Sequence, residues 1–311
     1  RSLLILYKSI FQLNMKIYDC FMFFDEDMLL DLRLNIMDKY VEKFVITEAT
    51  YMHNGSKKKL NFDINKFKKF KDKITYIVVD QPPPGLFLVN KNDTDESKEN
   101  KLILNGYKRD NFQREQAMSA LDDIDENDWI IINDIDEIPN LKNIDLKKIN
   151  NKFVIFKQQI FYYKFNLLYP DIPWFGSKAC KKKNFISPQW LRNVKHRKYP
   201  FWRLDTLFSK NKYSDIHIVN SGGWHFTNIK SAEDIEKKLL NYTHHYEFEQ
   251  SGLNANDIKK KILEKKIIYD HSTDQRGYKW GSEKTLQTLN ISKMPDYIVN
   301  NLDKYSNWLE T

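Results

Sequence analysis

The spacing of apolar positions changes repeatedly along the first half of the chain. Residues 16–24 (KIYDCFMFF) form a nearly continuous apolar run, which predicts a buried strand. Residues 25–40 place Leu29, Leu32 and Ile36 at a helical spacing, which predicts an amphipathic helix. Further strands are predicted at residues 43–47, 73–80 and 128–132, helices at 64–72 and 106–124, and a polar loop at 90–100. Because helices separate these strands, we expect βαβ units and an α/β fold with a mostly parallel central sheet.

The pattern changes after Pro139. Residues 151–169 (NKFVIFKQQIFYYKFNLLY) are aromatic and rich in β-forming residues, and a strand is also expected within residues 216–229 (IHIVNSGGWHFTNI). Helical spacing dominates residues 231–250 and 255–267. The sequence therefore predicts a mixed C-terminal half.

No internal repeat divides the chain, so we expect a single domain at residues 15–311. Residues 15–140 are expected to form a nucleotide-binding half, and residues 141–311 a half that shapes a second substrate site. Residues 1–14 precede Met15, which looks like a natural start, and are expected to be either an upstream extension or the remnant of a longer N-terminus.

Composition narrows the class of protein. The net charge of +8 is spread over the whole chain with no basic stripe, so we do not expect nucleic-acid binding. The two cysteines, Cys20 and Cys180, fit neither a disulfide framework nor a metal spacing, and favour a reducing compartment. No segment reaches the roughly 18 apolar residues of a membrane span, and Lys8 and Gln12 interrupt the apolar start. We therefore expect a cytoplasmic protein, for which peripheral membrane contact stays open.

Residues 127–140 (NDWIIINDIDEIPN) carry the candidate chemistry. A buried strand ends in Asp134, Asp136 and Glu137, and ligands of parallel sheets bind beyond the carboxyl ends of strands. Asp134 and Asp136 are two residues apart and are expected to project to one side, where carboxylates about 4 Å apart repel by roughly 4 kcal/mol. A divalent cation offsets this repulsion, and oxygen ligands favour Mg²⁺ or Mn²⁺. D-x-D after a strand is typical of nucleotide-sugar glycosyltransferases, although alone it also fits a solvated turn or a helix N-cap.

Four blocks of the sequence, taken in order, carry a resemblance to a known family. They are KIYDCFMFFDEDMLLDLRLNIMDKYVEKFVITEATYMHNG, NFQREQ, NDWIIINDIDEIPN and SGGWHFTNIKSAEDIEKKLLNYTH. Together they resemble glycosyltransferase family 17, the β-1,4-mannosyl-glycoprotein β-1,4-N-acetylglucosaminyltransferase family. The C-terminal MPDYIVNNLDKYSNWL is also similar, so the resemblance runs nearly from Met15 to the end. It implies a GT-A-like nucleotide-sugar-binding fold, a UDP-sugar donor and a divalent metal, Mn²⁺ or Mg²⁺.

The resemblance also assigns residues to the metal. Asp134 and Asp136 match the D-x-D acids, Glu137 matches the acid that follows, and His225 matches the histidine of G-W-H. His225 is expected to complete the metal shell, because Gly222 and Gly223 let the backbone turn closely past a ligand. The alternative is a core histidine beneath Trp224 and Phe226, which alternate with it along the strand.

Other candidates are less determined. Glu48 follows the second strand and is expected to touch the nucleoside, and Arg114 is expected to pair with the diphosphate as a guanidinium fork. A structural ion pair is the alternative for both. The general base is expected to be Glu137 or Asp205, between which the sequence does not choose.

The expected reaction is inverting transfer of a sugar, GlcNAc from UDP-GlcNAc or a close relative, to a glycan hydroxyl with a β-linkage. Residues 161–203, where acceptor contacts are expected, have no match in the family. Two alternatives are another nucleotide sugar used on a surface polysaccharide, and a non-catalytic glycan-binding module on the same fold. Three tryptophans are expected either to stack on sugars or to pack in the core: Trp174, Trp190 and Trp202. His244 matches a histidine that the family often carries, with no role assigned.

Overall fold

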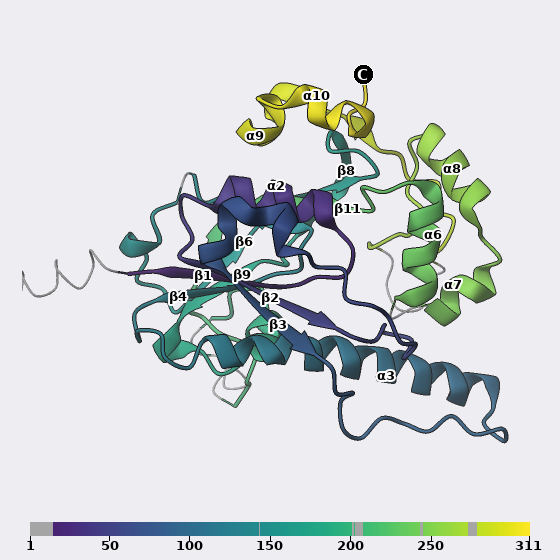
Figure 1. Cartoon of the computed structure of the whole chain (residues 1–311), viewed down its shortest axis with the longest axis horizontal. Helices are drawn as coiled ribbons and strands as arrows, with labels where there is room; N and C mark the ends of the chain where they lie inside the picture. The colour runs from purple at the N-terminus through teal and green to yellow at the C-terminus, as the bar shows by residue number, and fades with distance from the viewer. Residues whose placement is uncertain (1–14, 143, 201, 203–207, 243–244, 273–278) are drawn as a thin grey trace, which may run out of the picture.

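The computed structural model is an α/β fold built on two sheets (Figure 1). It describes residues 15–142, 144–200, 202, 208–242, 245–272 and 279–311. Asp205 and His244 lie outside the described residues. No helix of the described residues combines the length and the apolar character needed to span a bilayer.

The larger sheet has seven strands and is mostly parallel, as predicted. Its order is β3 (Ile74–Val79), β2 (Lys43–Ala49), β1 (Ile17–Met22), β4 (Trp129–Ile132), β9 (Lys178–Lys181), β6 (Phe153–Phe156) and β10 (Ile216–Val219). The exception is β9, which is antiparallel to both β4 and β6. This reversed strand was not among the strands predicted from the sequence.

Helices cover both faces of this sheet, which explains why its strands are continuously apolar. In Figure 1, α2 (Asp27–Met37) and α3 (Asp95–Glu115) lie on opposite faces. Along β4, Trp129 and Ile131 pack into the core on the α2 side, whereas Ile130 and Ile132 pack with Leu121 on the other side. The side of α3 is completed by η2 (Gln116–Ala120) and α4 (Pro188–Asn193), and that of α2 by η1 (Ile64–Lys73).

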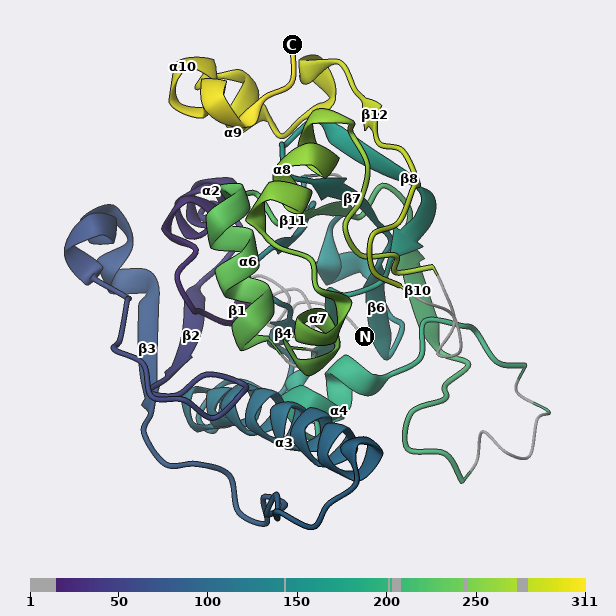
Figure 2. The same cartoon turned by 90° about the vertical axis from the view of Figure 1, so that its right-hand side faces the viewer.

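The smaller sheet follows the order β12 (Gln287–Thr288), β8 (Leu167–Trp174), β7 (Gln158–Tyr162), β11 (Gly223–Thr227) and β5 (Glu137–Pro139). Figure 2 shows α6, α7 and α8 beside it, with bounds Ala232–Asn241, His245–Ser251 and Ala255–Leu263. The chain ends in α9 (Asp296–Val299) and α10 (Leu302–Tyr305). The remaining short helices are η3 (Leu146–Lys148), η4 (Lys182–Asn184), η5 (Ile291–Lys293) and η6 (Ser306–Trp308).

Three of the predicted elements need correction. The helix predicted at residues 106–124 is α3, which ends at Glu115 and is followed by η2. The loop predicted at residues 90–100 ends early, because α3 begins at Asp95. The Thr94 side chain accepts a hydrogen bond from the Ser97 amide, and Asp95 and Glu96 complement the helix dipole, so the polar stretch is a helix start. The predicted helix at residues 64–72 is a 3₁₀ segment with a kink at Phe67.

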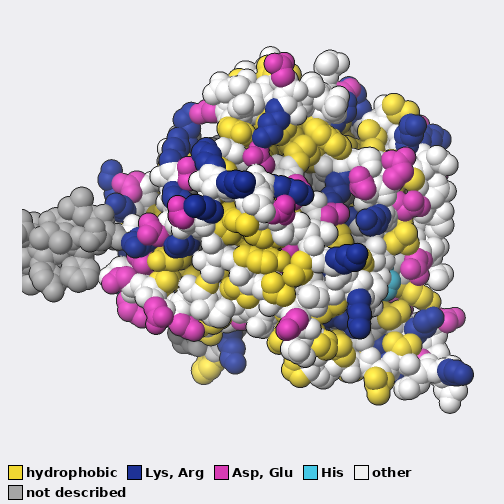
Figure 3. Space-filling model, viewed as in Figure 1, with side chains coloured by type: hydrophobic (Ala, Val, Ile, Leu, Met, Phe, Trp, Pro, Cys, Tyr) yellow, Lys and Arg dark blue, Asp and Glu magenta, His cyan; other side chains and the backbone are white. Residues whose placement is uncertain are grey.

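Charged side chains are interspersed on the surface. On the face shown in Figure 3, Lys and Arg lie among Asp and Glu and around apolar patches, without forming one continuous basic stripe. Many of these charges are exposed ion pairs such as that of Lys66 with Asp27.

A buried ion pair joins β1 to the turn that follows β4. Arg33 of α2 donates from Nε and Nη2 to the two carboxylate oxygens of Asp19, at 2.7 and 2.6 Å, and both side chains are fully buried. The third guanidinium nitrogen of Arg33 donates to the carbonyl of Glu137 at 2.7 Å, and Asn133 donates to Asp19 at 2.6 Å. Because Asp19 neutralises the guanidinium, Arg33 can hold the backbone of the acid turn from inside the protein.

Arg33→Met is predicted to lower the free energy of unfolding by about 3–5 kcal/mol, because it leaves the Asp19 carboxylate buried and unpaired. Urea unfolding measures this change. Lys66→Met, which removes a cation from the exposed pair with Asp27, is the matched control and should cost at most about 1 kcal/mol. Equal losses in the two variants would contradict this account of the turn.

Candidate active site

A cleft of about 570 Å³ lies at the carboxyl ends of the parallel strands. Its walls include the segments that follow β1, β2 and β4, together with side chains of α3, α4, β11 and α6. Asp134, Asp136, Arg114 and His225 all line it. Four of the residues chosen from the sequence are therefore in one cavity, at the edge of the sheet where α/β folds bind ligands.

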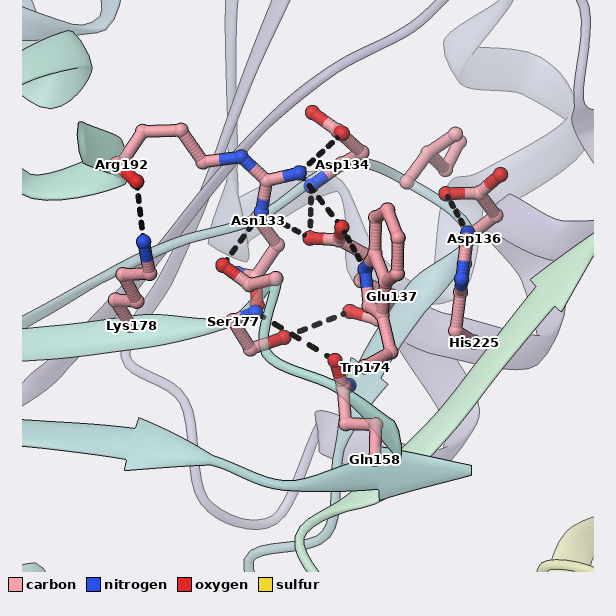
Figure 4. Close-up of polar contacts among 12 residues, drawn as sticks. Asn133, Asp134, Asp136, Glu137, Gln158, Trp174, Ser177, Lys178, Arg192 and His225 are labelled. Carbon is pink, nitrogen blue, oxygen red and sulfur yellow. Dashed lines mark hydrogen bonds and ion pairs between the residues drawn. The ribbon is translucent and has the colours of Figure 1, made fainter. Parts of the chain in front are cut away.

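The two D-x-D acids have different neighbours, as Figure 4 shows. Asp134 lies between two guanidiniums: Arg192 Nη2 donates to its Oδ2 at 2.6 Å and Arg114 Nη2 to its Oδ1 at 3.1 Å. Burial raises the pKa of Asp134, but Arg192 and Arg114 outweigh burial and hold the pKa well below its usual range. The Asp134 carboxylate therefore joins two arginines, which stabilise its charged form.

Asp136 faces His225 instead. Its Oδ1 lies 3.6 Å from His225 Nε2, which is beyond hydrogen-bond distance, and its Oδ2 lies 3.9 Å from the Lys238 ammonium. Burial raises the pKa of Asp136, but His225 and Lys238 outweigh burial and lower it. An ionised oxygen and an imidazole nitrogen thus face one another across a short gap.

The two glycines before His225 explain how it reaches the acids. Gly223 has φ +124°, and a Cβ on it would lie 2.1 Å from the carbonyl oxygen of Ile138, so only glycine lets β11 pass β5 this closely. In the β11–β5 ladder His225 pairs with Glu137, and the Phe226 amide donates to the Asp136 carbonyl at 2.8 Å. Phe226 is in the main core, as the alternation along the strand predicts.

Sequence comparison identifies the family. A sequence model of glycosyltransferase family 17 matches residues 7–310, which is nearly the whole chain. The chain belongs to glycosyltransferase family 17. The protein is thus a glycosyltransferase, and its two-sheet α/β architecture is the GT-A-like fold expected of it. The match begins eight residues before Met15.

Similarities to individual proteins are weaker than the match to the family. No curated protein sequence matches the chain. The structure is similar to that of a mycobacterial protein, with 13% identity, a TM-score of 0.29 and coverage of 74% of this chain and 75% of that one. It is also similar to glucosyl-3-phosphoglycerate synthase from Mycobacterium tuberculosis in complex with Mn²⁺, UDP and phosphoglyceric acid, with 13% identity, a TM-score of 0.30 and coverage of 93% and 92%. Both TM-scores are too low for either likeness to bear on mechanism.

In this family 17 glycosyltransferase, Glu137 is fully buried and its carboxylate is saturated. Oε1 accepts from Trp174 Nε1 at 2.5 Å and from Arg192 Nη2 at 2.7 Å. Oε2 accepts from Arg192 Nη1 at 2.6 Å and from the Asp134 amide at 2.9 Å. Even a Cβ on Gly176 would lie 1.9 Å from Oε1. No lone pair is left for an acceptor proton, so this environment favours a positioning role over the predicted role of general base.

Glu48 does not reach the cleft. It is fully buried and accepts hydrogen bonds from the Asn61 and Phe62 amides, the Tyr76 hydroxyl and the Lys58 ammonium. These partners make Glu48 a structural ion pair that fixes the loop after β2. The expected contact with the nucleoside is therefore not supported, and the alternative considered from the sequence fits.

Arg192 is the functional residue that the sequence analysis missed. It lies on α4, lines the cleft, and joins Glu137 to Asp134, while it also donates to the Gly176 carbonyl. The signal available in the sequence was indirect: a carboxylate buried after an apolar strand needs a cation, but 50 Lys and Arg residues could supply it. Arg114 was predicted to pair with the diphosphate, with a structural ion pair as the alternative. In the structure its guanidinium lies in ion pairs with Asp134 and Asp110.

The tryptophans mostly have packing roles. Trp174 stacks on the imidazole of His225, with ring centroids 4.6 Å apart, and so supports the histidine while lining the cleft. Trp190 packs against Phe153, and Trp202 is 69% exposed. The Nδ1 of His225 is buried with no hydrogen-bond partner among the described residues, which leaves Trp174 and the ladder to fix the ring.

The donor set at Asp136 and His225 fits a divalent cation. Two ligand atoms held at about 2.0–2.2 Å by one ion lie about 3–4 Å apart, and the observed separation is 3.6 Å. Carboxylate oxygen and imidazole nitrogen both suit Mn²⁺. Within the described ranges no group of three or more His, Cys, Asp or Glu side chains is gathered for a metal, and Asp134 accepts a hydrogen bond from Arg192.

Glu137→Gln is predicted to lower the free energy of unfolding by about 3 kcal/mol or more, because it leaves the Arg192 guanidinium without its buried counter-charge. Chemical denaturation measures the loss. Asp134→Asn is the matched control, because it removes the other acid bound by Arg192. The Asp134 side chain is one-third exposed, so a smaller loss in the free energy of unfolding is expected. A Glu137→Gln variant as stable as wild type but unable to transfer sugar would instead support the role of general base.

Proposed function

We propose that the protein is an inverting, metal-dependent glycosyltransferase that moves GlcNAc, or a closely related sugar, from its UDP donor to a glycan hydroxyl with a β-linkage. The observation that carries this proposal is the pair formed by Asp136 and His225, 3.6 Å apart in the cleft beyond β4. Membership of family 17 supports sugar transfer, and the metal-compatible pair supports a nucleotide diphosphate as the leaving group.

The charge of the cleft supports a metal. Four acids line it, Glu26, Asp110, Asp134 and Asp136, and so do four bases, Lys58, Arg114, Arg192 and Lys238, which gives a net charge of zero with neutral histidines. A diphosphate brings at least two negative charges into this balanced site. Mn²⁺ or Mg²⁺ held by Asp136 and His225, when bound, would neutralise the charge that develops on the departing diphosphate.

The two halves of the chain contribute different walls, which supports a donor side and an acceptor side. Residues 22–24 and 51–53 and the cleft face of α3 come from the half proposed to bind the nucleotide. Trp174, Tyr269, His271 and Trp280 come from the other half and form an aromatic wall. Burial lowers the pKa of His271 to about 3, so this wall is uncharged at neutral pH and suits the C–H faces of a sugar.

The acceptor hydroxyl must lose its proton as it attacks the anomeric carbon from the face opposite the diphosphate. Glu137 is saturated by hydrogen bonds, so we propose Asp205 as the base and assign Glu137 to positioning Arg192 and Trp174. By its position in the sequence, Asp205 belongs to residues 141–311, the half expected to shape the acceptor site.

Two other functions use the same cleft. A different nucleotide sugar, transferred to a surface polysaccharide, would need the same diphosphate and metal chemistry. A non-catalytic glycan-binding module would need neither. Titration of UDP-GlcNAc with and without Mn²⁺ separates these functions: only a UDP-GlcNAc transferase, with water attacking the anomeric carbon in place of the acceptor hydroxyl, releases UDP, and only in the presence of metal.

Asp136→Asn is predicted to keep the fold and to lower metal-dependent UDP release by at least about 100-fold, because it removes the ionised oxygen that faces His225. Steady-state UDP release at saturating Mn²⁺ measures the change, and the unfolding midpoint checks the fold. Asp122→Asn removes an exposed acid and should leave both values unchanged. If Asp136→Asn is folded and releases UDP at the wild-type rate, the proposed metal site is wrong.

A further inference from the structure

Lys238 stands apart from the other cations of the cleft. Its ammonium lines the cavity and makes no hydrogen bond to any described residue; its nearest acid is Asp136, at 3.9 Å. The side chain is 24% exposed, so it is neither buried against a partner nor fully in solvent. A lysine in this position has its donors free for a ligand.

The other three cations are already occupied. Arg192 donates to Glu137, Asp134 and the Gly176 carbonyl, and Arg114 donates to Asp110, Asp134 and Gln189. Lys58 is held by the buried Glu48. Most donors of these three side chains are used in this way, and the Nε of Arg114, which has no partner among the described residues, is buried. Lys238, in contrast, has only the long ion pair with Asp136, at 3.9 Å.

The way in which α6 is anchored places Lys238 in the cleft. Ser231 caps the helix by accepting a hydrogen bond from the Asp234 amide, and Ala232, Ile235 and Leu239 bury one face against the second sheet. This anchorage turns the last part of the helix toward the cleft, whose lining includes Leu239 and Asn241 as well as Lys238. The adjacent Lys237 is exposed and is absent from the lining.

We propose that Lys238 is a catalytic residue that binds the diphosphate of the donor and stabilises it as the leaving group; this inference rests on the proposed function. As the bond between the anomeric carbon and the diphosphate oxygen breaks, its electron pair stays on that oxygen, whose charge the ammonium binds. The acceptor oxygen forms the new bond and its proton passes to the base.

Its place beside Asp136 gives Lys238 a second effect. In the metal-free cleft the ammonium partly neutralises the same carboxylate that is proposed to bind the cation. A metal ion and Lys238 therefore compete for Asp136, and a diphosphate relieves the competition because it attracts both. Loss of the lysine charge should weaken UDP binding and strengthen metal binding, two changes of opposite sign.

Isothermal titration of Lys238→Met tests this inference, with Lys237→Met as the matched control on the same helix. Without metal, UDP is expected to bind Lys238→Met about 10- to 100-fold more weakly than wild type, the range for loss of one charge-assisted hydrogen bond. Uridine, which lacks the diphosphate, should bind Lys238→Met and the wild-type protein with equal affinity. Mn²⁺ alone should bind Lys238→Met a few-fold more tightly, and Lys238→Arg should recover most of the UDP affinity.

The outcomes separate this inference from the proposed function. Wild-type UDP affinity in Lys238→Met, or equal losses for UDP and uridine, would overturn the role of Lys238 and leave the transferase proposal standing. Equal weakening in Lys237→Met would overturn it too, because a diffuse charge effect would then suffice. Failure of the wild-type protein to bind UDP, with or without Mn²⁺, would remove both proposals.

Discussion

The buried ion pair of Asp19 and Arg33 is the constraint on which the site depends. A guanidinium with no solvent exposure is tolerated only because two carboxylate oxygens and the carbonyls of the acid turn take up its donors. The pair thereby fixes the backbone between β4 and β5 relative to β1 and α2. The position of Asp134 and Asp136 follows from this arrangement, because Arg33 binds the backbone of their turn from inside the protein without a ligand.

A second buried pair, Glu137 with Arg192, sorts the acids by role. Arg192 binds Glu137 through two hydrogen bonds and Asp134 through a third, so Asp134 is committed to arginines. Asp136 lies on the other side of the turn, where the β11 ladder brings His225 to it. Three acids in four residues are thus divided into one that is structural, one that organises two arginines, and one that faces the imidazole across a gap suited to a cation.

Much of this architecture follows from local patterns in the sequence. Continuous apolar runs predict strands that are covered on both faces, and the acids directly after such a run must lie at its carboxyl end. Gly222 and Gly223 before a strand predict a close approach of two backbones, and the φ of +124° at Gly223 shows why glycine is needed. His225 could therefore be placed near the acids although about 90 residues separate it from them.

What the sequence could not supply was the choice of partners across the fold. Arg192 and Lys238 are two of many cations, and nothing in the neighbouring residues distinguishes one that faces a buried carboxylate from one that faces solvent. The order of the three acids likewise does not show which carboxylate is buried. Glu137 is buried only because Trp174 of β8 and Arg192 of α4 cover it. The reversed strand β9 depends on the pairing of distant segments and has no local signature.

Anomalous diffraction at the manganese edge, from crystals grown with Mn²⁺ and UDP, tests whether Asp136 and His225 bind the metal. We expect a single strong peak between the Asp136 carboxylate and His225 Nε2, at about 2.0–2.3 Å from each, with Asp134 still bound by Arg192. A peak elsewhere in the cleft, or UDP bound with no peak between these two side chains, would contradict it.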